Sequence, residues 1–218
     1  MCSIGLIKAI IFDVDGVLID SNKIIVEAYQ KTAKKLGLGI PSDKEILDLF
    51  GKPLEEIVRI LWPNTNQELY IKKYRELFMD ENLVIPKIDG AIDAVRKIKN
   101  SGFKLGIISG KIMFFIKKHL EESGFDIKWF EAIGSFEVTK KHKPDPEPLF
   151  YVMDKLNVKP EETLYVGDAI SDHGCAKNAK VEYVAVLTGC LNREELEKLG
   201  VKNIITSVDE LPKFLRVE

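Results

Sequence analysis

Two aspartates separated by a single residue, Asp13 and Asp15, directly follow the mostly apolar run 8–12. A strand that is buried on both faces has such a continuous apolar sequence, so we expect the two carboxylates at the carboxyl end of a central strand, where open α/β sheets bind their ligands. Two carboxylates this close repel each other unless a cation or a shared proton relieves them. Mg²⁺ prefers such oxygen ligands. The pair therefore indicates a magnesium site, and the plainer alternative is a polar turn after a strand.

Ser109 and Gly110 follow a second predicted strand, 104–108, and open a predicted helix. A hydroxyl beside exposed backbone N–H groups at the start of a helix forms a natural phosphate site, although a serine there is more often a simple N-cap. Lys143 lies in a loop before another helix, and the proline that follows it fixes the backbone. A lysine in a loop is ordinarily solvated, so these residues gain weight only in combination.

Asp168 follows the predicted strand 163–166, and Asp172 lies one helical turn further along the chain. Either carboxylate alone has a plain role as a helix cap. Parallel strands bring their carboxyl ends to one edge of the sheet, however, so we expect Asp168 to converge with Asp13. Together with the backbone carbonyl of Asp15, these acids would supply hard oxygen ligands for Mg²⁺.

The hydroxyl and ammonium groups are expected at the same edge of the sheet. Lys143 and Ser109 would hold an anion that the metal also contacts. A carboxylate nucleophile, a metal that neutralises charge and donors that orient oxygens are the requirements of phosphoryl transfer. The combination of separated segments therefore predicts a phosphoryl-transfer site.

A helix-rich segment follows the first strand. Ser21 is a candidate cap for its first helix, and the capping-box sequence that begins at Ser42 predicts a second helix through Leu49. Pro53 suits the first position of a third helix, and a fourth is expected over 68–79. No convincing strand interrupts this segment, so it reads as a small helical subdomain.

Beyond residue 86, predicted strands and helices alternate, as is typical of a parallel sheet covered on both faces. The expected strands are 104–108, 131–133, 163–166, 183–187 and 203–205, and the expected helices are 111–123, 146–156, 171–178, 193–199 and 208–214. We therefore expect an α/β fold with a three-layer, Rossmann-like parallel-sheet core. The core would comprise residues 1–19 and 87–218, with the all-helical subdomain 20–86 inserted after the first strand.

Composition and charge exclude several classes of protein. The 218 residues are 45% hydrophobic, which is enough for a large core, and the net charge of −2 offers no electrostatic surface for nucleic acid. No apolar stretch approaches the roughly 20 residues of a membrane span. Cys2, Cys175 and Cys190 are odd in number and form no C-x-x-C pair, which argues against disulfides and a structural zinc site. We expect a cytoplasmic protein without a nucleic-acid or membrane partner.

The order and spacing of the polar segments resemble the motifs of the haloacid dehalogenase-like hydrolase superfamily, in the branch similar to phosphoglycolate phosphatase and β-phosphoglucomutase. Its first motif, D-x-D-G-[TV]-[LI], corresponds to residues 13–18, and its second, a Ser or Thr at a strand end, to Ser109. Its third is a Lys, often followed by Pro, which selects Lys143 over the neighbouring lysines. Its fourth, G-D-x-x-x-D, corresponds to residues 167–172. The helical subdomain lies where this branch carries its cap.

The resemblance implies a mechanism for the first two acids. Asp13 would attack phosphorus, and Asp15 would protonate the leaving alkoxide and then activate water against the aspartyl-phosphate. Mg²⁺ is the implied cofactor. The implied metal site comprises Asp13, Asp15, Asp168 and Asp172, the last directly or through water.

The resemblance also implies how the phosphate is held. Ser109 and the N–H group of Gly110 would bind phosphate oxygens, and Lys143 would neutralise charge between Asp13 and the phosphate. Lys52, in a turn of the cap, is a further candidate contact for the substrate. Many phosphatases of this branch carry Asn where this chain has Gly110, so phosphoglycolate as the substrate stays open.

The expected activity is that of a Mg²⁺-dependent phosphatase, acting on a small phosphorylated metabolite such as phosphoglycolate or a sugar phosphate. A β-phosphoglucomutase-like mutase shares the core chemistry and is an open alternative. A non-enzymatic phospho-acceptor similar to a receiver domain is a remote one, opposed by the helical insertion and the D-x-D spacing. Asp15 argues against a dehalogenase, whose first motif usually lacks an acid there. The protein is expected to be a monomer or a homodimer.

The histidines show no metal-ligand spacing. We interpret His119, His142 and His173 as surface or packing residues, and expect only His173, beside Asp172, to approach the site. The remaining distinctive side chains are also interpreted as packing residues: Cys175, Cys190, Trp62 and Trp129.

Overall fold

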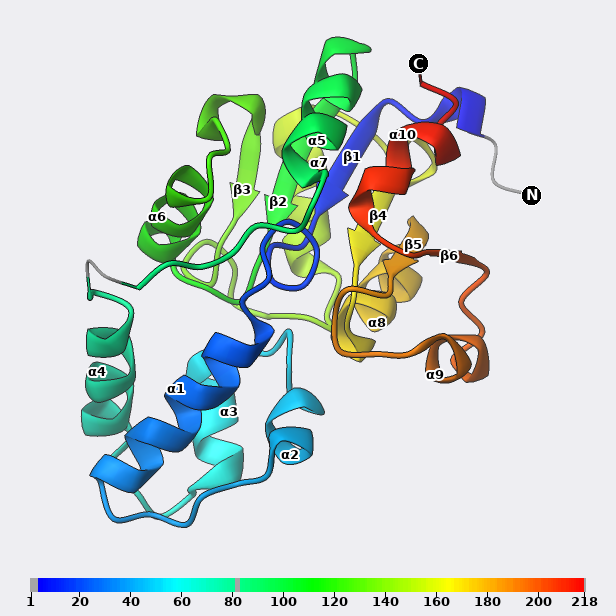
Figure 1. The fold of residues 1–218 in the computed structure, drawn as a ribbon. Helices are drawn as coiled ribbons and strands as arrows, with labels where there is room; N and C mark the ends of the chain where they lie inside the picture. Colours follow the sequence, from blue (N-terminus) through cyan, green and yellow to red (C-terminus); the bar gives the residue numbers. More distant parts are fainter. Residues whose placement is uncertain (1–3, 81–82, 218) are drawn as a thin grey trace.

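A single parallel sheet organises the computed structural model, which describes residues 4–80 and 83–217. Cys2 lies outside the described residues. The strand order is β3-β2-β1-β4-β5-β6. The strands are β1 (Ala9–Phe12), β2 (Lys104–Ile108), β3 (Ala132–Gly134), β4 (Thr163–Gly167), β5 (Glu182–Val186) and β6 (Asn203–Ile205). The predicted α/β fold with a Rossmann-like parallel sheet is confirmed (Figure 1).

The direction in which the sheet grows changes at β1. The chain adds β2 and then β3 on one side of β1, and it returns to place β4 on the other side. In register, Phe12 lies between Ile107 of β2 and Val166 of β4. Such a switch point opens a crevice at the carboxyl ends of the strands, which is where open α/β sheets bind ligands. The residues that directly follow β1 and β4 therefore lie at this crevice.

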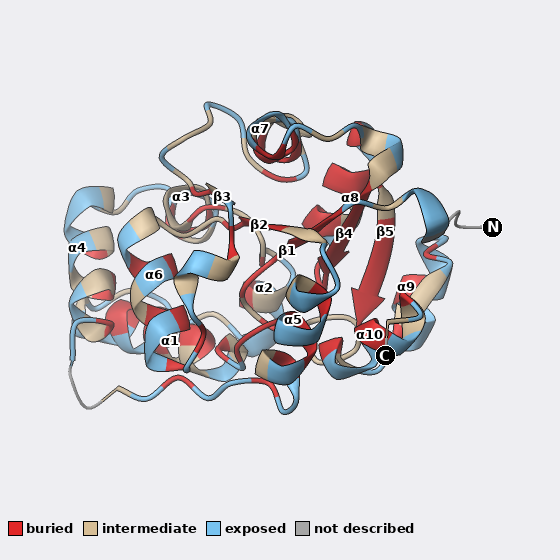
Figure 2. Ribbon diagram, turned by 90° about the horizontal axis from the view of Figure 1, so that it is seen from above, coloured by how far each residue is buried: buried red, intermediate tan, exposed pale blue. Residues whose placement is uncertain are grey.

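Helices cover both faces of the sheet because successive strand residues point to opposite faces. Ile10 and Phe12 pack with helices α5, α6 and α10, whereas Ala9 and Ile11 pack with α7, α8 and α9. Seen from above, the strands are largely buried and the helices expose their outer sides (Figure 2). The helices of the core are α5 (Ala91–Asn100), α6 (Met113–Glu122), α7 (Glu147–Leu156), α8 (Ile170–Ala179), α9 (Arg193–Lys198) and α10 (Leu211–Phe214), with short 3₁₀ turns at Ile4–Leu6, Ile127–Trp129, Pro160–Glu162 and Val208–Glu210.

Four helices between β1 and α5 pack mainly on one another, beside the carboxyl end of β1 (Figure 1). They are α1 (Asn22–Lys35), α2 (Asp43–Leu47), α3 (Leu54–Leu61) and α4 (Gln67–Leu77). We call these four helices and the turns next to them, residues 22–78, the helical region. The two chain segments that connect it to the sheet are paired: the N–H group of Asp20 donates to the carbonyl of Pro86 at 2.7 Å, and that of Ile88 to Leu18 at 3.2 Å.

The details of the helix ends differ from the sequence predictions. The capping box at Ser42 is present, but its helix ends at Leu47, before the predicted Leu49. Pro53 precedes α3 and is not its first residue. Ser21 occupies the N-cap position of α1 without making a capping bond, because its backbone has ψ near −7° and not the extended conformation of a cap. The predicted capping role of Ser21 is therefore wrong.

Strand ends also shift by a residue. β3 begins at Ala132 because Glu131 is exposed and forms an ion pair with Lys99 at 2.7 Å, so it lies outside the buried strand.

The packing role of Trp62 is confirmed: its ring stacks on Tyr70 with centroids 4.6 Å apart, and its N–H donates to the carbonyl of Gly39. Within the described part of the chain, no helix is long and apolar enough to cross a bilayer.

Candidate active site

Three buried carboxylates meet at the crevice. Asp13 directly follows β1, Asp168 directly follows β4, and Asp172 lies in the first turn of α8. Each of the three offers a carboxylate oxygen, and these oxygens all lie within 4.8 Å of one another. The three residues are at most 5% exposed. The strand ends thus bring together acids that are more than 150 positions apart in the sequence, as the sequence pattern predicted.

Lys143 places a buried ammonium group among these acids. Its Nζ lies 3.0 Å from Oδ1 of Asp13 and 2.6 Å from Oδ1 of Asp172. Burial by itself lowers the pKa of Lys143, but the two carboxylates outweigh burial and hold the pKa above its usual range. Lys143 is therefore charged at neutral pH. The neighbouring Lys141 is exposed and pairs with Asp145, which agrees with the choice of Lys143 from the sequence.

The cluster carries more negative than positive charge. Burial, reinforced by Asp172 and Asp15, raises the pKa of Asp13 to about 7 despite the opposing effect of Lys143. Burial, reinforced by the carboxylates of Asp172 and Asp13, also raises the pKa of Asp168. The raised pKa values reflect burial first and repulsion between the carboxylates second, and a bound cation would relieve both. A set of hard carboxylate oxygens in this condition fits a divalent cation such as Mg²⁺.

Asp172 differs from the other two acids because its carboxylate is already saturated with hydrogen bonds. Oδ1 accepts from Lys143 and, at 2.7 Å, from the hydroxyl of Tyr165, while Oδ2 accepts from the N–H groups of Asp168 and Ala169 at 3.1 and 3.0 Å. A carboxylate has about four acceptor positions, and all are in use. Asp172 therefore positions Lys143 and the loop that carries Asp168.

The carboxylate of Asp168 lies in a cradle of backbone. The N–H group of Cys190 donates to Oδ2 of Asp168 at 3.0 Å. A Cβ atom on Gly189 would lie 1.9 Å from that oxygen, and one on Gly16 would lie 2.5 Å from it. Gly16 also has a φ of +72°, a conformation that glycine adopts readily. Positions 16 and 189 therefore have no room for a side chain beside this carboxylate.

The side chain of Asp15 is not part of the three-carboxylate cluster. Its Oδ1 accepts hydrogen bonds from the hydroxyl of Ser21 and the ammonium group of Lys111. Burial alone raises the pKa of Asp15, but the charge and hydrogen bond of Lys111, with the hydrogen bond of Ser21, more than offset it, so the pKa is lowered. Any role of Asp15 at the metal therefore falls to its backbone carbonyl.

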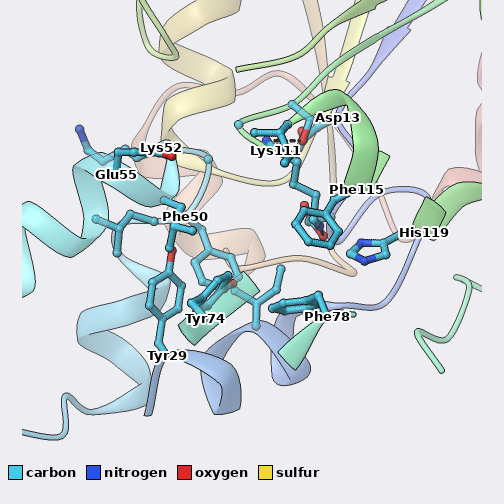
Figure 3. A pocket seen from close by; sticks show the side chains of 18 of the residues that line it. Asp13, Tyr29, Phe50, Lys52, Glu55, Tyr74, Phe78, Lys111, Phe115 and His119 are labelled. Carbon is cyan, nitrogen blue, oxygen red and sulfur yellow. Dashed lines mark hydrogen bonds and ion pairs between the residues drawn. The ribbon is translucent and has the colours of Figure 1, made fainter. Parts of the chain in front are cut away.

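Ser109 and Gly110 line the same cavity as Asp13, Asp15 and Lys143, and this cavity has a volume of about 100 Å³. The helical region closes over it at Lys52, since a Cβ on Gly110 would lie 3.1 Å from the carbonyl oxygen of Lys52. The side chain of Lys52 points away from Asp13 and pairs with Glu56 (Figure 3). Its predicted contact with the substrate stays a prediction.

The wall opposite the acids is largely aromatic. Tyr29, Tyr74 and Phe78 come from the helical region, and Phe115 comes from α6 of the core. Figure 3 shows Tyr29, Tyr74 and Phe78 away from Asp13, with Phe115 between Asp13 and Phe78.

His119 lies against this wall, with its ring centroid 5.6 Å from that of Phe78 and 5.4 Å from that of Phe115. The expectation that only His173 would approach the site is wrong. His173 contacts the ring of Tyr183 and does not line the cavity, whereas His119 is buried and does.

The cysteines fit their predicted roles as packed thiols. Cys175 is buried and donates to the carbonyl of Asp145 at 3.2 Å, and burial raises the pKa of its thiol to about 12. Burial also raises the pKa of Cys190.

Sequence reasoning missed three residues of the site. Tyr165 lies within a buried strand, where its phenol needs a polar partner, so the sequence could have predicted that its hydroxyl contacts a buried polar group. Lys111 follows Ser109 by two positions at the start of a helix, a weaker signal. His119 lies on the same helix as Phe115, one turn later, and nothing in the sequence distinguishes it from a core histidine.

A Rossmann-like sheet with acids, a lysine and a serine at its switch point defines a class of hydrolase that transfers phosphoryl groups. Residues 10–186 match the family model described as haloacid dehalogenase-like hydrolase, and the chain belongs to this family. It is therefore an enzyme, and the predicted resemblance is confirmed.

Relatives in other organisms cover nearly the whole chain. A Clostridium perfringens (strain 13 / Type A) protein named after the pyrophosphatase PpaX is 34% identical over 94% of this chain and 94% of its own length. Pyrophosphatase PpaX of Halalkalibacterium halodurans is 27% identical over 97% of this chain and 98% of its own length. A solved Bacteroides fragilis structure, described as a haloacid dehalogenase-like hydrolase, has a TM-score of 0.84 and 30% identity over 94% of this chain and 99% of its own. These relatives support a phosphatase in general terms.

Proposed function

We propose that this enzyme is a Mg²⁺-dependent phosphatase that hydrolyses a small phosphorylated metabolite through an aspartyl-phosphate on Asp13. The observation that carries the proposal is the position of Asp13: its carboxylate lies at the switch point, 3.0 Å from the ammonium group of Lys143 and within 4.8 Å of the oxygens of Asp168 and Asp172. A nucleophile needs such neighbours, because the phosphoryl group brings negative charge toward a negative carboxylate.

Asp13 and Asp168, with the backbone carbonyl of Asp15, would hold the metal. Mg²⁺, when bound, would neutralise charge on the phosphoryl oxygens and orient them. Lys143 would neutralise the remaining charge between Asp13 and phosphate. Ser109 and the N–H group of Gly110 line the cavity beside Asp13, where they would bind phosphate oxygens.

Asp15 would move the protons. Its pairing with Lys111 and Ser21 keeps its carboxylate ionised, which is the form that accepts a proton from the water attacking the aspartyl-phosphate. To protonate the leaving alkoxide in the first step, Asp15 must take up a proton, and movement of Lys111 away from it would favour that uptake.

The segment 20–86 would act as a cap over the core formed by 1–19 and 87–218. The paired connections at Asp20 and Pro86 are the natural hinge. The hydroxyl of Ser171 in α8 donates to the carbonyl of Phe50 in the helical region at 3.1 Å, so a contact exists that opening would break. Closure would exclude water from the reacting groups.

A panel of phosphorylated metabolites, assayed for phosphate release with Mg²⁺ and with chelator, tests the proposal. The panel includes phosphoglycolate, sugar phosphates and pyrophosphate. We expect Mg²⁺-dependent phosphate release from at least one monoester. Isomerisation of a sugar phosphate that needs a bisphosphate activator, without net phosphate release, would instead identify a mutase.

A further inference from the structure

The half of the cavity that faces away from the acids is lined mainly by aromatic and aliphatic side chains. We define the apolar chamber by Tyr29, Phe50, Ile57, Tyr74, Phe78 and Phe115, all of them buried and all lining the cavity. The aromatic rings form a connected series, with centroid distances of 4.7 Å from Tyr29 to Tyr74, 5.1 Å from Tyr74 to Phe78 and 6.1 Å from Phe78 to Phe115. Phosphate bound at Ser109 and Lys143 would point its leaving group into this chamber, because the chamber is the part of the cavity wall to which neither residue belongs.

The cations around the cavity are already neutralised. Among the residues that the structure describes, each basic side chain in the cavity wall forms an ion pair: Lys52 with Glu56, Arg75 with Glu55, Lys111 with Asp15, and Lys143 with Asp13 and Asp172. A leaving group that carried its own carboxylate or phosphate would need one of these pairs to break. Burying such a charge without a partner is costly. The chamber therefore disfavours an anionic leaving group.

Hydrogen-bonding capacity in the chamber is also limited, because the hydroxyl groups of Tyr29 and Tyr74 are hydrogen-bonded to each other. Of the described residues in the cavity wall, only His119 has buried polar side-chain atoms without a partner, namely its two ring nitrogens. Burial, with a contribution from Lys111, lowers the pKa of His119 to about 3, so the ring is neutral and offers one donor and one acceptor. A sugar would bring several hydroxyl groups into this space, and unsatisfied hydroxyls are unfavourable. His119 can therefore satisfy one polar group on the ligand.

From these contacts we infer that the substrate is a phosphate monoester of a small apolar, preferably aromatic, alcohol with at most one further neutral polar group. The leaving group occupies the apolar chamber, and its polar group pairs with His119. The inference rests on the proposed phosphatase function and names its substrate class. The overall reaction is the ester and water giving the free alcohol and inorganic phosphate: the P–O bond to the alcohol oxygen breaks, and that oxygen receives a proton.

A series of alkyl phosphates measures this preference on the wild-type enzyme with Mg²⁺. Methyl, n-butyl and 2-phenylethyl phosphate have leaving alcohols of similar basicity, so differences in kcat/KM report binding in the chamber. We expect kcat/KM to rise by roughly fourfold for each methylene that is buried. We also expect 2-phenylethyl phosphate to exceed glycerol phosphate, phosphoglycolate and pyrophosphate by about tenfold or more.

The outcomes separate this inference from the proposed function. A flat series, or the highest kcat/KM with pyrophosphate, phosphoglycolate or a sugar phosphate, overturns the apolar substrate class while phosphatase activity stands. If no monoester releases phosphate in the presence of Mg²⁺, the proposed function itself is wrong, and the substrate class fails with it.

Two adjacent phenylalanines provide a matched pair of variants. Phe115 is 8% exposed and lines the chamber, whereas Phe114 is 52% exposed and does not line the cavity. Phe115→Leu should reduce the ratio of kcat/KM for 2-phenylethyl over methyl phosphate by about fivefold or more. Phe114→Leu, the same change one residue earlier, should leave that ratio unchanged. Equal effects of the two substitutions would contradict a leaving-group site at Phe115.

His119→Phe tests the polar contact, because it preserves an aromatic ring and removes both nitrogens. The probes are 2-phenylethyl phosphate and its three ring-hydroxylated isomers. In the wild type, at least one isomer should exceed the parent compound by about fivefold, the effect of one hydrogen bond. His119→Phe should remove that advantage while raising or preserving kcat/KM for the parent. An advantage that persists in the variant would show that His119 is only a packing residue.

Discussion

The acid end and the apolar chamber of the same cavity are built from different interactions. At the acid end, Lys143 joins Asp13 and Asp172 through charged hydrogen bonds of 3.0 and 2.6 Å. In the chamber, the rings of Phe78 and Phe115 make apolar contact with centroids 6.1 Å apart. Charged hydrogen bonds fix direction and distance, whereas apolar contacts depend mainly on buried area. Under the proposed function, the acid end would carry out the reaction and the chamber would select the alcohol that carries the phosphate.

The two ends also come from different parts of the chain. Strand ends of the core supply Asp13 and Asp168, while Tyr29, Tyr74 and Phe78 come from the helical region. Repacking an apolar wall costs little, but a catalytic group displaced by about 1 Å costs on the order of 100-fold in rate. Substitutions at the acid end should therefore have the larger effects on turnover. The following experiments test this ranking.

Asp13→Asn should have the largest effect, a loss of kcat of about 10⁴-fold or more, because the amide cannot act as the nucleophile. The amide oxygen still accepts a hydrogen bond from Lys143, so circular dichroism should show an unchanged fold. Asp154→Asn is the matched control, since Asp154 is exposed on α7 and lies outside the cavity. Near-normal turnover of Asp13→Asn would refute the assignment of the nucleophile.

Gly189→Ala tests how tightly the acid end is fixed, without changing any charged group. The new Cβ would lie 1.9 Å from Oδ2 and 2.1 Å from Cβ of Asp168, so that carboxylate must move. We expect a loss of about 100-fold in kcat/KM and weaker Mg²⁺ binding in isothermal titration calorimetry. Gly39→Ala, where the new methyl group meets no neighbour, should leave both quantities unchanged. Normal Mg²⁺ affinity in Gly189→Ala would show that the acid end adapts as readily as the chamber.

The contrast between the acid end and the apolar chamber also explains how much of the site could be predicted from the sequence. Strands and their ends follow from buried apolar runs, so the convergence of Asp13 and Asp168 could be predicted once the sheet was taken as parallel. Asp172 could be placed at the site from its spacing, but its role as a fully bonded positioning group depends on Tyr165, which only tertiary structure brings to it.

The sequence does not determine which partners the long, flexible side chains contact. Lys111 reaches Asp15 across 96 positions, and Ser21 donates to the same carboxylate when its spacing suggests a helix cap. In each case several partners compete for one flexible donor, and the packed structure decides between them. The aromatic chamber was equally inaccessible, because Phe115 meets Phe78 only when the helical region lies against the core.

The stability of the metal-free protein should depend on pH through the acid end of the cavity. The pKa of Asp13 is raised to about 7 in the folded protein, against an ordinary value of about 3.9 when unfolded. The folded state therefore binds the proton more tightly, and stability falls as the pH rises toward 7. We expect the free energy of unfolding of the wild type, minus that of Asp13→Asn, to fall by about 1.4 kcal/mol per pH unit between pH 5 and 6, and by about half of that slope as the pH reaches 7.

Urea unfolding of both proteins in chelator provides this difference. Contributions common to both proteins, such as that of His119 with its lowered pKa, cancel in the subtraction. Saturating Mg²⁺ should reverse the trend, because the ion competes with the proton for the same carboxylate. A difference that is constant over this range would mean that Asp13 is ionised in the folded protein even without metal.

The smallest effect is expected at the contact between α8 of the core and the turn that precedes α3. Ser171 of α8 donates to the carbonyl of Phe50 at 3.1 Å, and its Oγ would lie 1.8 Å from a Cβ on Gly51, so the two segments are in close contact. Ser171→Ala removes one hydrogen bond of the closed arrangement, worth about 1 kcal/mol. The closed population should fall accordingly, raising KM about fivefold with little change in kcat and speeding hydrogen exchange over residues 50–53. Ser101→Ala, which removes a hydroxyl-to-carbonyl bond within the core, should change neither. If Ser171→Ala also leaves KM and exchange unaltered, contact between the helical region and the core is maintained by the apolar chamber alone.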